Sequence, residues 1–163
     1  MDEEQIEKLG LIIFSLKEFC YGLDRLDEIS EEVEQGCAQM RFYMSSLYEY
    51  TARYFLLDKQ DDLPIGGNLY PALKELGLED YLDPIINTLN EKIGSLDLYT
   101  ILRTFRNKMI AHGKFTLEPL EKKIYEIEDL RKPENYIRFQ ELLQRLYDQV
   151  KELYVNLSNL LQQ

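Results

Sequence analysis

The stretch SLDLYTILRTFRNKMIAHGK, residues 95–114, predicts one amphipathic helix with a recognisable N-cap residue and a recognisable stop residue. Ser95 is the expected N-cap, and Asp97 in the first turn suits the positive end of the helix dipole. Gly113 is the expected stop, because glycine adopts the left-handed conformation that ends a helix at little cost. The apolar side chains recur at the spacing of one buried face: Leu98, Ile101, Leu102, Phe105 and Met109.

Two longer stretches with the same spacing flank this one. In residues 3–27 the predicted buried face consists of Ile6, Leu9, Ile13, Leu16, Cys20 and Leu23. In residues 134–161 it consists of Phe139, Leu143, Leu146, Val150, Leu153, Leu157 and Leu160. A further long helix is expected over residues 31–58, with Ser30 as its N-cap.

Shorter elements are predicted between the long helices. Residues 59–68 contain a proline and a Gly-Gly pair and predict a loop, and a short helix over residues 70–76 ends at Gly77. Asp83 and Pro84 are the expected N-cap and first helical residue of another helix, which ends at Gly94. Residues 115–132 predict a loop with a short helical or extended piece.

The sequence therefore predicts an all-α fold. Alternation with a period of two, typical of strands, does not extend beyond a few residues. The prediction is an antiparallel, up-and-down helical bundle of about five to six helices, forming a single domain over residues 1–163.

The composition is that of an ordinary globular chain, with 163 residues, 45% hydrophobic and 30% charged. The acidic N-terminus lacks the apolar segment of a signal peptide, and no apolar run reaches transmembrane length, so no membrane association is expected. Cys20 and Cys37 are too few for a disulfide framework or a zinc site, and we expect both to be buried thiols. A cytoplasmic protein without metal or cofactor is the resulting expectation.

The charge is unevenly distributed along the chain. The net charge of −11 argues against a general nucleic-acid-binding protein, because phosphate contacts need lysine and arginine. Residues 95–114 nevertheless hold four basic residues and one acidic residue, whereas the rest of the chain holds 15 basic and 29 acidic residues. A small basic site on an acidic body suits a selective RNA enzyme, a protein with a basic partner, or simply a solvated helix face.

The end of the 95–114 stretch contains a specific motif. Arg106 is followed by Asn107, and His112, the only histidine of the chain, comes six residues after the arginine. This pattern resembles the signature of HEPN domains, in which an arginine, often followed by a polar residue, precedes a histidine by a short interval on a helix. The resemblance covers most of the chain at the level of the all-helical fold only.

The resemblance implies a function and a site. Many HEPN proteins are metal-independent endoribonucleases that act as toxins or phage-defence effectors, with a composite active site at a homodimer interface. The implied catalytic residues here are Arg106, His112 and Asn107, and the residues that would contact RNA phosphates are Arg103, Lys108 and Lys114. One HEPN group, paired with a nucleotidyltransferase antitoxin, has a modified tyrosine two residues after the histidine; this chain has Lys114 there.

Other interpretations of the same residues stay open. The histidine suits a simple helix cap, Arg106 suits a surface ion pair with Asp97 or Glu118, and Asn107 suits an exposed position. At the level of function, the alternative is a non-catalytic HEPN-like binding subunit, such as the partner or substrate-binding component of a nucleotidyltransferase. A structural helical adaptor with an acidic surface agrees with the composition alone.

Overall fold

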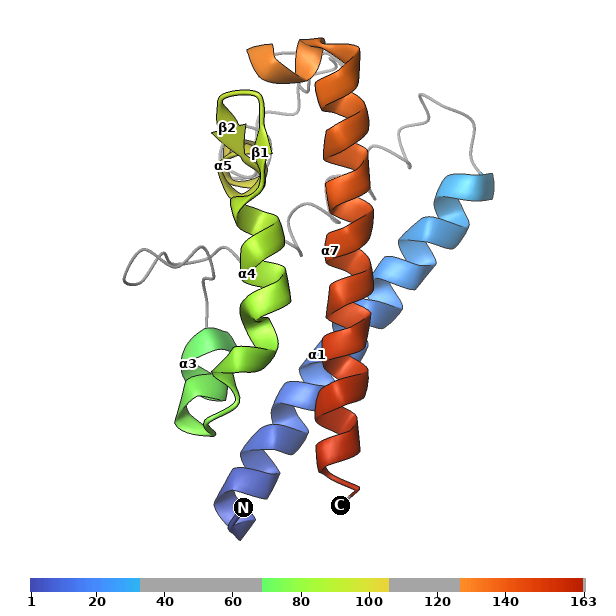
Figure 1. Ribbon diagram of the computed structural model, residues 1–163. Helices are drawn as coiled ribbons and strands as arrows, with labels where there is room; N and C mark the ends of the chain where they lie inside the picture. The colour runs from blue at the N-terminus through green and yellow to red at the C-terminus, as the bar shows by residue number, and fades with distance from the viewer. Residues whose placement is uncertain (33–68, 106–126, 163) are drawn as a thin grey trace.

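The computed structural model describes residues 1–32, 69–105 and 127–162, and these are mostly helical (Figure 1). The elements in chain order, with η for a 3-10 helix, are α1 (Glu3–Glu32), α3 (Leu69–Glu75), η1 (Glu79–Leu82), α4 (Asp83–Asn90), β1 (Lys92–Ile93), β2 (Leu96–Asp97), α5 (Leu98–Phe105), η3 (Glu128–Arg131) and α7 (Pro133–Leu160). The all-α fold class is confirmed. The up-and-down arrangement stays a prediction, because the predicted helix over residues 31–58 and the predicted loop over 59–68 lie almost wholly outside the described residues.

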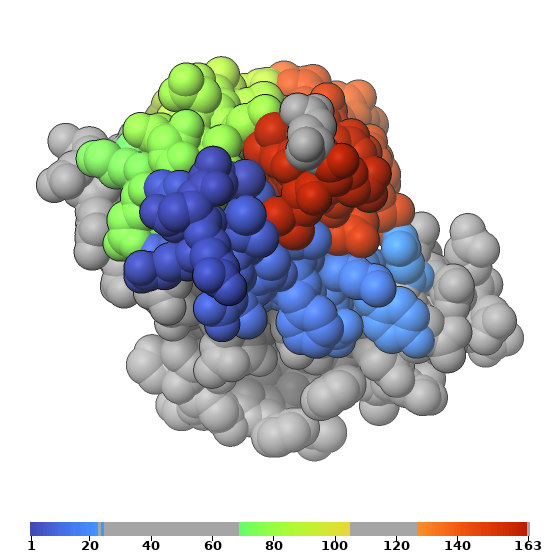
Figure 2. Space-filling view, turned by 90° about the horizontal axis from the view of Figure 1, so that it is seen from below, coloured from blue at the N-terminus to red at the C-terminus, as the bar shows by residue number. Residues whose placement is uncertain are grey.

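Helix α7 is the centre of the described fold and packs against both α1 and α4 (Figure 1). Its bounds agree with the prediction over residues 134–161. Viewed from the end of the molecule near both termini, the start of α1, the α3–α4 region and the end of α7 lie side by side (Figure 2). The buried face of α7 consists of Phe139, Leu142, Leu146, Val150, Leu153 and Leu157. The prediction is therefore correct except that Leu142 is buried, whereas Leu143 and Leu160 are only half-buried.

The buried face of α1 is rotated from the predicted one. Leu9, Leu16 and Cys20 are buried as predicted. Ile12 and Phe19 are buried as well, whereas Ile6 is 47% exposed and Ile13 is only partly buried. The side chain of Leu23 lies outside the described part of the chain. A pattern with steps of three and four fits two neighbouring stripes of a helix almost equally, and only the packing partner selects between them.

The predicted boundary after α1 is wrong. The sequence predicts an end near Asp27 and an N-cap at Ser30, but α1 continues to Glu32. Residues 23–32 contain neither glycine nor proline, and glutamate is a good helix former, so nothing in this stretch stops a helix that is already formed. A serine marks a helix start only where the preceding backbone is not helical.

The short helix α3 ends as predicted. Gly77 has a φ of +67°. The N–H of Gly77 donates to the carbonyl of Lys74 at 3.0 Å, and the N–H of Leu78 donates to that of Leu73 at 2.9 Å. This is the paired hydrogen-bond pattern of a Schellman motif, and it confirms Gly77 as the stop.

The helix predicted from Asp83 to Gly94 is only partly correct. Asp83 is helical, with φ −52° and ψ −44°, because η1 runs directly into α4; the N-cap position is Leu82, which makes no side-chain cap. Helix α4 ends at Asn90, and Ile93 pairs with Leu96 in an antiparallel two-strand hairpin. Gly94, with a φ of +64°, is in the hairpin turn. Positive φ serves helix stops and tight hairpins alike, so the glycine alone does not distinguish them.

Within the described residues, no helix is long and apolar enough to cross a membrane. Of the predicted segment 115–132, the part that is described contains η3, a short helical piece with Leu130 fully buried.

Candidate functional site

Helix α5 is the described part of the predicted motif helix. Leu98, Ile101 and Leu102 are buried in the core, as their spacing predicts. Arg103 is exposed and makes no ion pair with a described residue. The apolar stripe therefore fixes one face of α5 against the protein and directs Arg103 outward.

Arg103 is the only predicted site residue that the structure describes. Phe105 is the last described residue of α5, and the motif begins at the next position. Five predicted site residues lie outside the described residues: Arg106, Asn107, Lys108, His112 and Lys114. The predicted stop at Gly113 and the predicted core residue Met109 lie in the same segment.

The start of α5 differs from the prediction. Asp97 is the N-cap, because its Oδ1 accepts a hydrogen bond from the backbone N–H of Thr100 at 2.7 Å. Burial alone would raise the pKa of Asp97, but hydrogen bonds from Thr100 and Lys92 hold the pKa below its usual range. The N-cap is therefore two residues later than predicted, because Leu96 and Asp97 belong to β2.

Ser95, the predicted N-cap, has another partner. Its backbone N–H donates to Asp129 Oδ2 at 3.0 Å, and its hydroxyl donates to the same oxygen. Asn135 Nδ2 donates to the backbone carbonyl of Asp129 at 2.8 Å. A methyl group on Gly94 would lie 2.5 Å from Asp129 Oδ1, so only glycine fits there. We call these four residues, Gly94, Ser95, Asp129 and Asn135, the hairpin clamp.

The hairpin clamp connects the hairpin before the motif segment to η3, which comes after it in the sequence. Helix α5 follows the hairpin directly and precedes residues 106–126 in the sequence. Ile127 and η3 follow that segment, and the hairpin clamp binds η3 to the same hairpin. The bonds from Ser95 lower the pKa of Asp129. Ser95 and Asp129 are 34 positions apart in the sequence, so no local pattern predicts the hairpin clamp.

A second polar contact ties the same region to α7. Glu91, just after α4, forms ion pairs with Arg138 and Arg145, which are two turns apart on α7. The backbone carbonyl of Glu91 also accepts the N–H of Leu98 at 3.0 Å, at the start of α5. The position of α5 is therefore fixed by its apolar packing and by the ion pairs and backbone hydrogen bond of Glu91.

A titratable cluster joins α1 to α7. Asp24 Oδ1 accepts hydrogen bonds from Tyr147 and from Lys151, the latter at 2.6 Å, and the ammonium of Lys151 lies 4.2 Å from the centre of the Tyr147 ring. These contacts lower the pKa of Asp24 and raise that of Lys151, while burial raises the pKa of the Cys20 thiol. A lysine held charged and a thiol held protonated are poor nucleophiles, so we interpret this cluster as a structural contact between α1 and α7.

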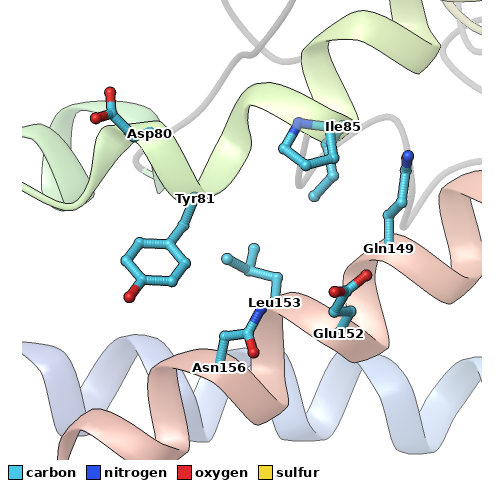
Figure 3. Close-up of a pocket in the computed structure, with 8 residues that line it drawn as sticks. Asp80, Tyr81, Ile85, Gln149, Glu152, Leu153 and Asn156 are labelled. Atoms are coloured by element: carbon cyan, nitrogen blue, oxygen red, sulfur yellow. The ribbon is translucent and has the colours of Figure 1, made fainter.

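One described cavity lies between η1, α4 and α7 (Figure 3). It measures about 170 Å³, and its lining comprises Asp80, Tyr81, Pro84, Ile85, Gln149, Glu152, Leu153 and Asn156. Within the described residues, no group of three or more histidine, cysteine, aspartate or glutamate side chains is placed to hold a metal ion.

Comparison with known proteins finds no relative: no family model, no curated protein and no solved structure matches the chain.

Proposed function

We propose that the protein is a metal-independent endoribonuclease of the HEPN type, acting as a toxin or phage-defence effector. The observation that carries the proposal is the position of the motif, which begins directly after a helix whose apolar face is buried and whose basic residue is exposed. In the sequence, Arg106 follows directly after this anchored helix, which ends at Phe105. The all-α fold agrees with the HEPN type and does not by itself distinguish it.

The proposed chemistry needs an arginine and a histidine. In cleavage without metal, the 2′-hydroxyl loses its proton to a base and attacks the adjacent phosphorus, so that a 2′,3′-cyclic phosphate forms as the bond to the 5′-oxygen breaks. The reaction also requires stabilisation of the charge that develops on the phosphate and protonation of the leaving 5′-oxygen. The guanidinium of Arg106 would bind the phosphate oxygens, and His112, whose intrinsic pKa is near neutral, would donate the proton. Asn107 would orient these groups, and Arg103, Lys108 and Lys114 would bind neighbouring phosphates.

A homodimer is part of the proposal. If the helix continues through the motif, Arg106 and His112 are about 9 Å apart along the axis and about 120° apart around it, so they do not share one stripe. Two motif helices that meet across a two-fold axis would bring both pairs into one cleft. Symmetric dimers of this kind are the commonest oligomers.

The test is cleavage of a mixed RNA pool by the purified protein in excess chelator. We expect cleavage by the native chain and its loss in both Arg106→Ala and His112→Ala, with unchanged circular dichroism. Lys17→Ala, which removes an exposed basic residue on α1, is the matched control and should cleave normally. Arg103→Ala should raise KM more than it lowers kcat, because a phosphate contact beside the reacting atoms contributes to binding.

The opposite outcome points to the other class of function. If the native chain leaves RNA intact, or if both motif variants still cleave it, the nuclease proposal is wrong. The non-catalytic binding subunit, partnered with a nucleotidyltransferase or another protein, would then be favoured, since the net charge of −11 opposes RNA binding. Size-exclusion chromatography with light scattering tests the homodimer separately.

A further inference from the structure

The cavity between η1, α4 and α7 combines an apolar floor with polar walls. Ile85 and Leu153 are almost completely buried and form the floor, and Pro84 adds to it. Figure 3 shows Tyr81 extending from η1 toward α7 and Leu153 rising into the space between the two walls. The methylene groups of a bound side chain would pack chiefly on Pro84, which is exposed, because Ile85 and Leu153 leave almost no surface uncovered.

The polar walls offer hydrogen-bond acceptors and a negative charge. Glu152 and Asn156 extend from α7, one turn apart, beside Leu153 (Figure 3). Gln149 is on the same helix, and its Oε1 is the one buried side-chain polar atom in the described residues that makes no hydrogen bond. Because the terminal torsion of glutamine is broad, this oxygen can turn toward a donor without giving up an existing bond.

No basic side chain lines the cavity, so its charge is not neutralised from within. Glu152 is exposed on one wall, and Asp80 is on the opposite side with its carboxylate directed away from the cavity in Figure 3. The chain as a whole carries a net charge of −11. This cavity, a groove between η1, α4 and α7, therefore favours a ligand that carries a positive charge and N–H donors.

We propose that this groove binds an arginine side chain of a partner protein. A planar guanidinium would stack on the ring of Tyr81, which is 36% exposed, and donate to Glu152 and to the amide oxygen of Asn156, which are one turn apart on α7. Its five donors in a fixed plane suit several acceptors better than an ammonium does.

The size of the cavity selects a protein partner over a free small molecule. Pockets that enclose small-molecule ligands are about 300–1,000 Å³, and this one is about 170 Å³. That volume accommodates a single long side chain, of the kind that anchors an interface from a central position. This inference goes beyond the proposed nuclease and does not depend on it, because none of the lining residues belongs to the motif.

The test is a nuclear magnetic resonance titration of the full chain at about physiological salt. The probe is the capped peptide Ala-Ala-Arg-Ala-Ala, and the matched peptide has citrulline, which keeps the shape and loses the charge. We expect the arginine peptide to shift the amides of residues 80–85 and 149–156, and the citrulline peptide to leave them in place. General shifts over the acidic surface with both peptides would overturn the proposal.

Variants locate the contact. Glu152→Gln should weaken binding about five-fold, as expected for one charge-assisted hydrogen bond at a surface. Glu141→Gln, an exposed acid on α7 outside the cavity, should leave binding unchanged. Tyr81→Leu should weaken binding and Tyr81→Phe preserve it, because the ring and not the hydroxyl holds the guanidinium. Equal effects of Glu152→Gln and Glu141→Gln would refute the assignment.

A third probe separates the two sources of positive charge. Spermidine carries ammonium groups on apolar stems and needs no protein partner. If it shifts the same amides at lower concentration than the arginine peptide, the groove binds a free polyamine and the protein-partner proposal is wrong. Weaker or diffuse spermidine shifts support the arginine side chain.

Discussion

Gly94 gives the sharpest test of the hairpin clamp, because the structure separates two costs of replacing it by alanine. Its φ of +64° is in the left-handed region, where a non-glycine residue costs about 1–2 kcal/mol. The new methyl group would also lie 2.5 Å from Asp129 Oδ1, well inside ordinary contact distance. Forcing a methyl group into occupied space adds about 1–3 kcal/mol. We therefore expect Gly94→Ala to lower the free energy of unfolding by about 2–5 kcal/mol, the sum of these two ranges.

Two other glycines are matched controls for this experiment. Gly77 has almost the same φ, +67°, but open space where a methyl group would go, so Gly77→Ala should cost only the backbone part, about 1–2 kcal/mol. Gly10 is inside α1, also with open space, and Gly10→Ala should raise the free energy of unfolding by about 0.5–1 kcal/mol. Urea unfolding at equilibrium measures all three.

A double-mutant cycle with Asp129→Ala isolates the contact. In that background the obstructing carboxylate is gone and only Asn135 Nδ2, at 3.1 Å, still crowds the methyl group, so Gly94→Ala should cost clearly less than in the native chain and approach the cost of Gly77→Ala. The reasoning is refuted if Gly94→Ala costs the same with and without the Asp129 side chain, or if it costs no more than Gly77→Ala in the native chain.

Three further predictions concern the groups that position α5. Asp97→Ala should lower the free energy of unfolding by about 1 kcal/mol through loss of the N-cap, and Asp97→Asn should restore most of it in urea unfolding. Asp129 has a folded-state pKa below its unfolded value, so its stabilisation is present above pH 3.8 and is lost as the pH falls through the folded pKa. The difference in urea midpoint between the native chain and Asp129→Asn should therefore shrink on acidification, and a constant difference would contradict this. Glu91→Gln should destabilise by about 1 kcal/mol at low salt and by less in 1 M salt, which screens the two ion pairs it removes.

The core was predictable from the sequence because burial leaves a periodic pattern. The spacing of apolar residues located α7 to within one residue at each end and identified most of its buried side chains. In α5 it identified Leu98, Ile101 and Leu102 correctly and missed Tyr99, which is also buried. It failed in detail at Ile6 and Ile12 of α1, where two neighbouring stripes are both apolar and the choice between them depends on the packing partner.

Turns and polar contacts were less predictable, for a different reason. Gly94 and Ser95 have the residue types of a helix stop and a helix start, yet they form the tip of a hairpin. There Ser95 donates a hydrogen bond to Asp129, which is 34 residues further along the chain. The bridge between Asp24 and Lys151 likewise joins the two ends of the sequence. Caps and turns use the same few residue types, and tertiary contacts decide among them.

The distribution of paired charges relates the fold to the proposed site. On α7, Arg138 and Arg145 are engaged by Glu91, and Lys151 is engaged by Asp24, so these cations hold helices together and are not available to a phosphate. Arg103 differs, because it is exposed and makes no ion pair with a described residue. An acidic protein that binds RNA must keep its few unpaired cations close together, since phosphate attraction elsewhere is opposed by its own surface. Arg103, near the end of α5 and three residues before the motif arginine, is where such a site would begin.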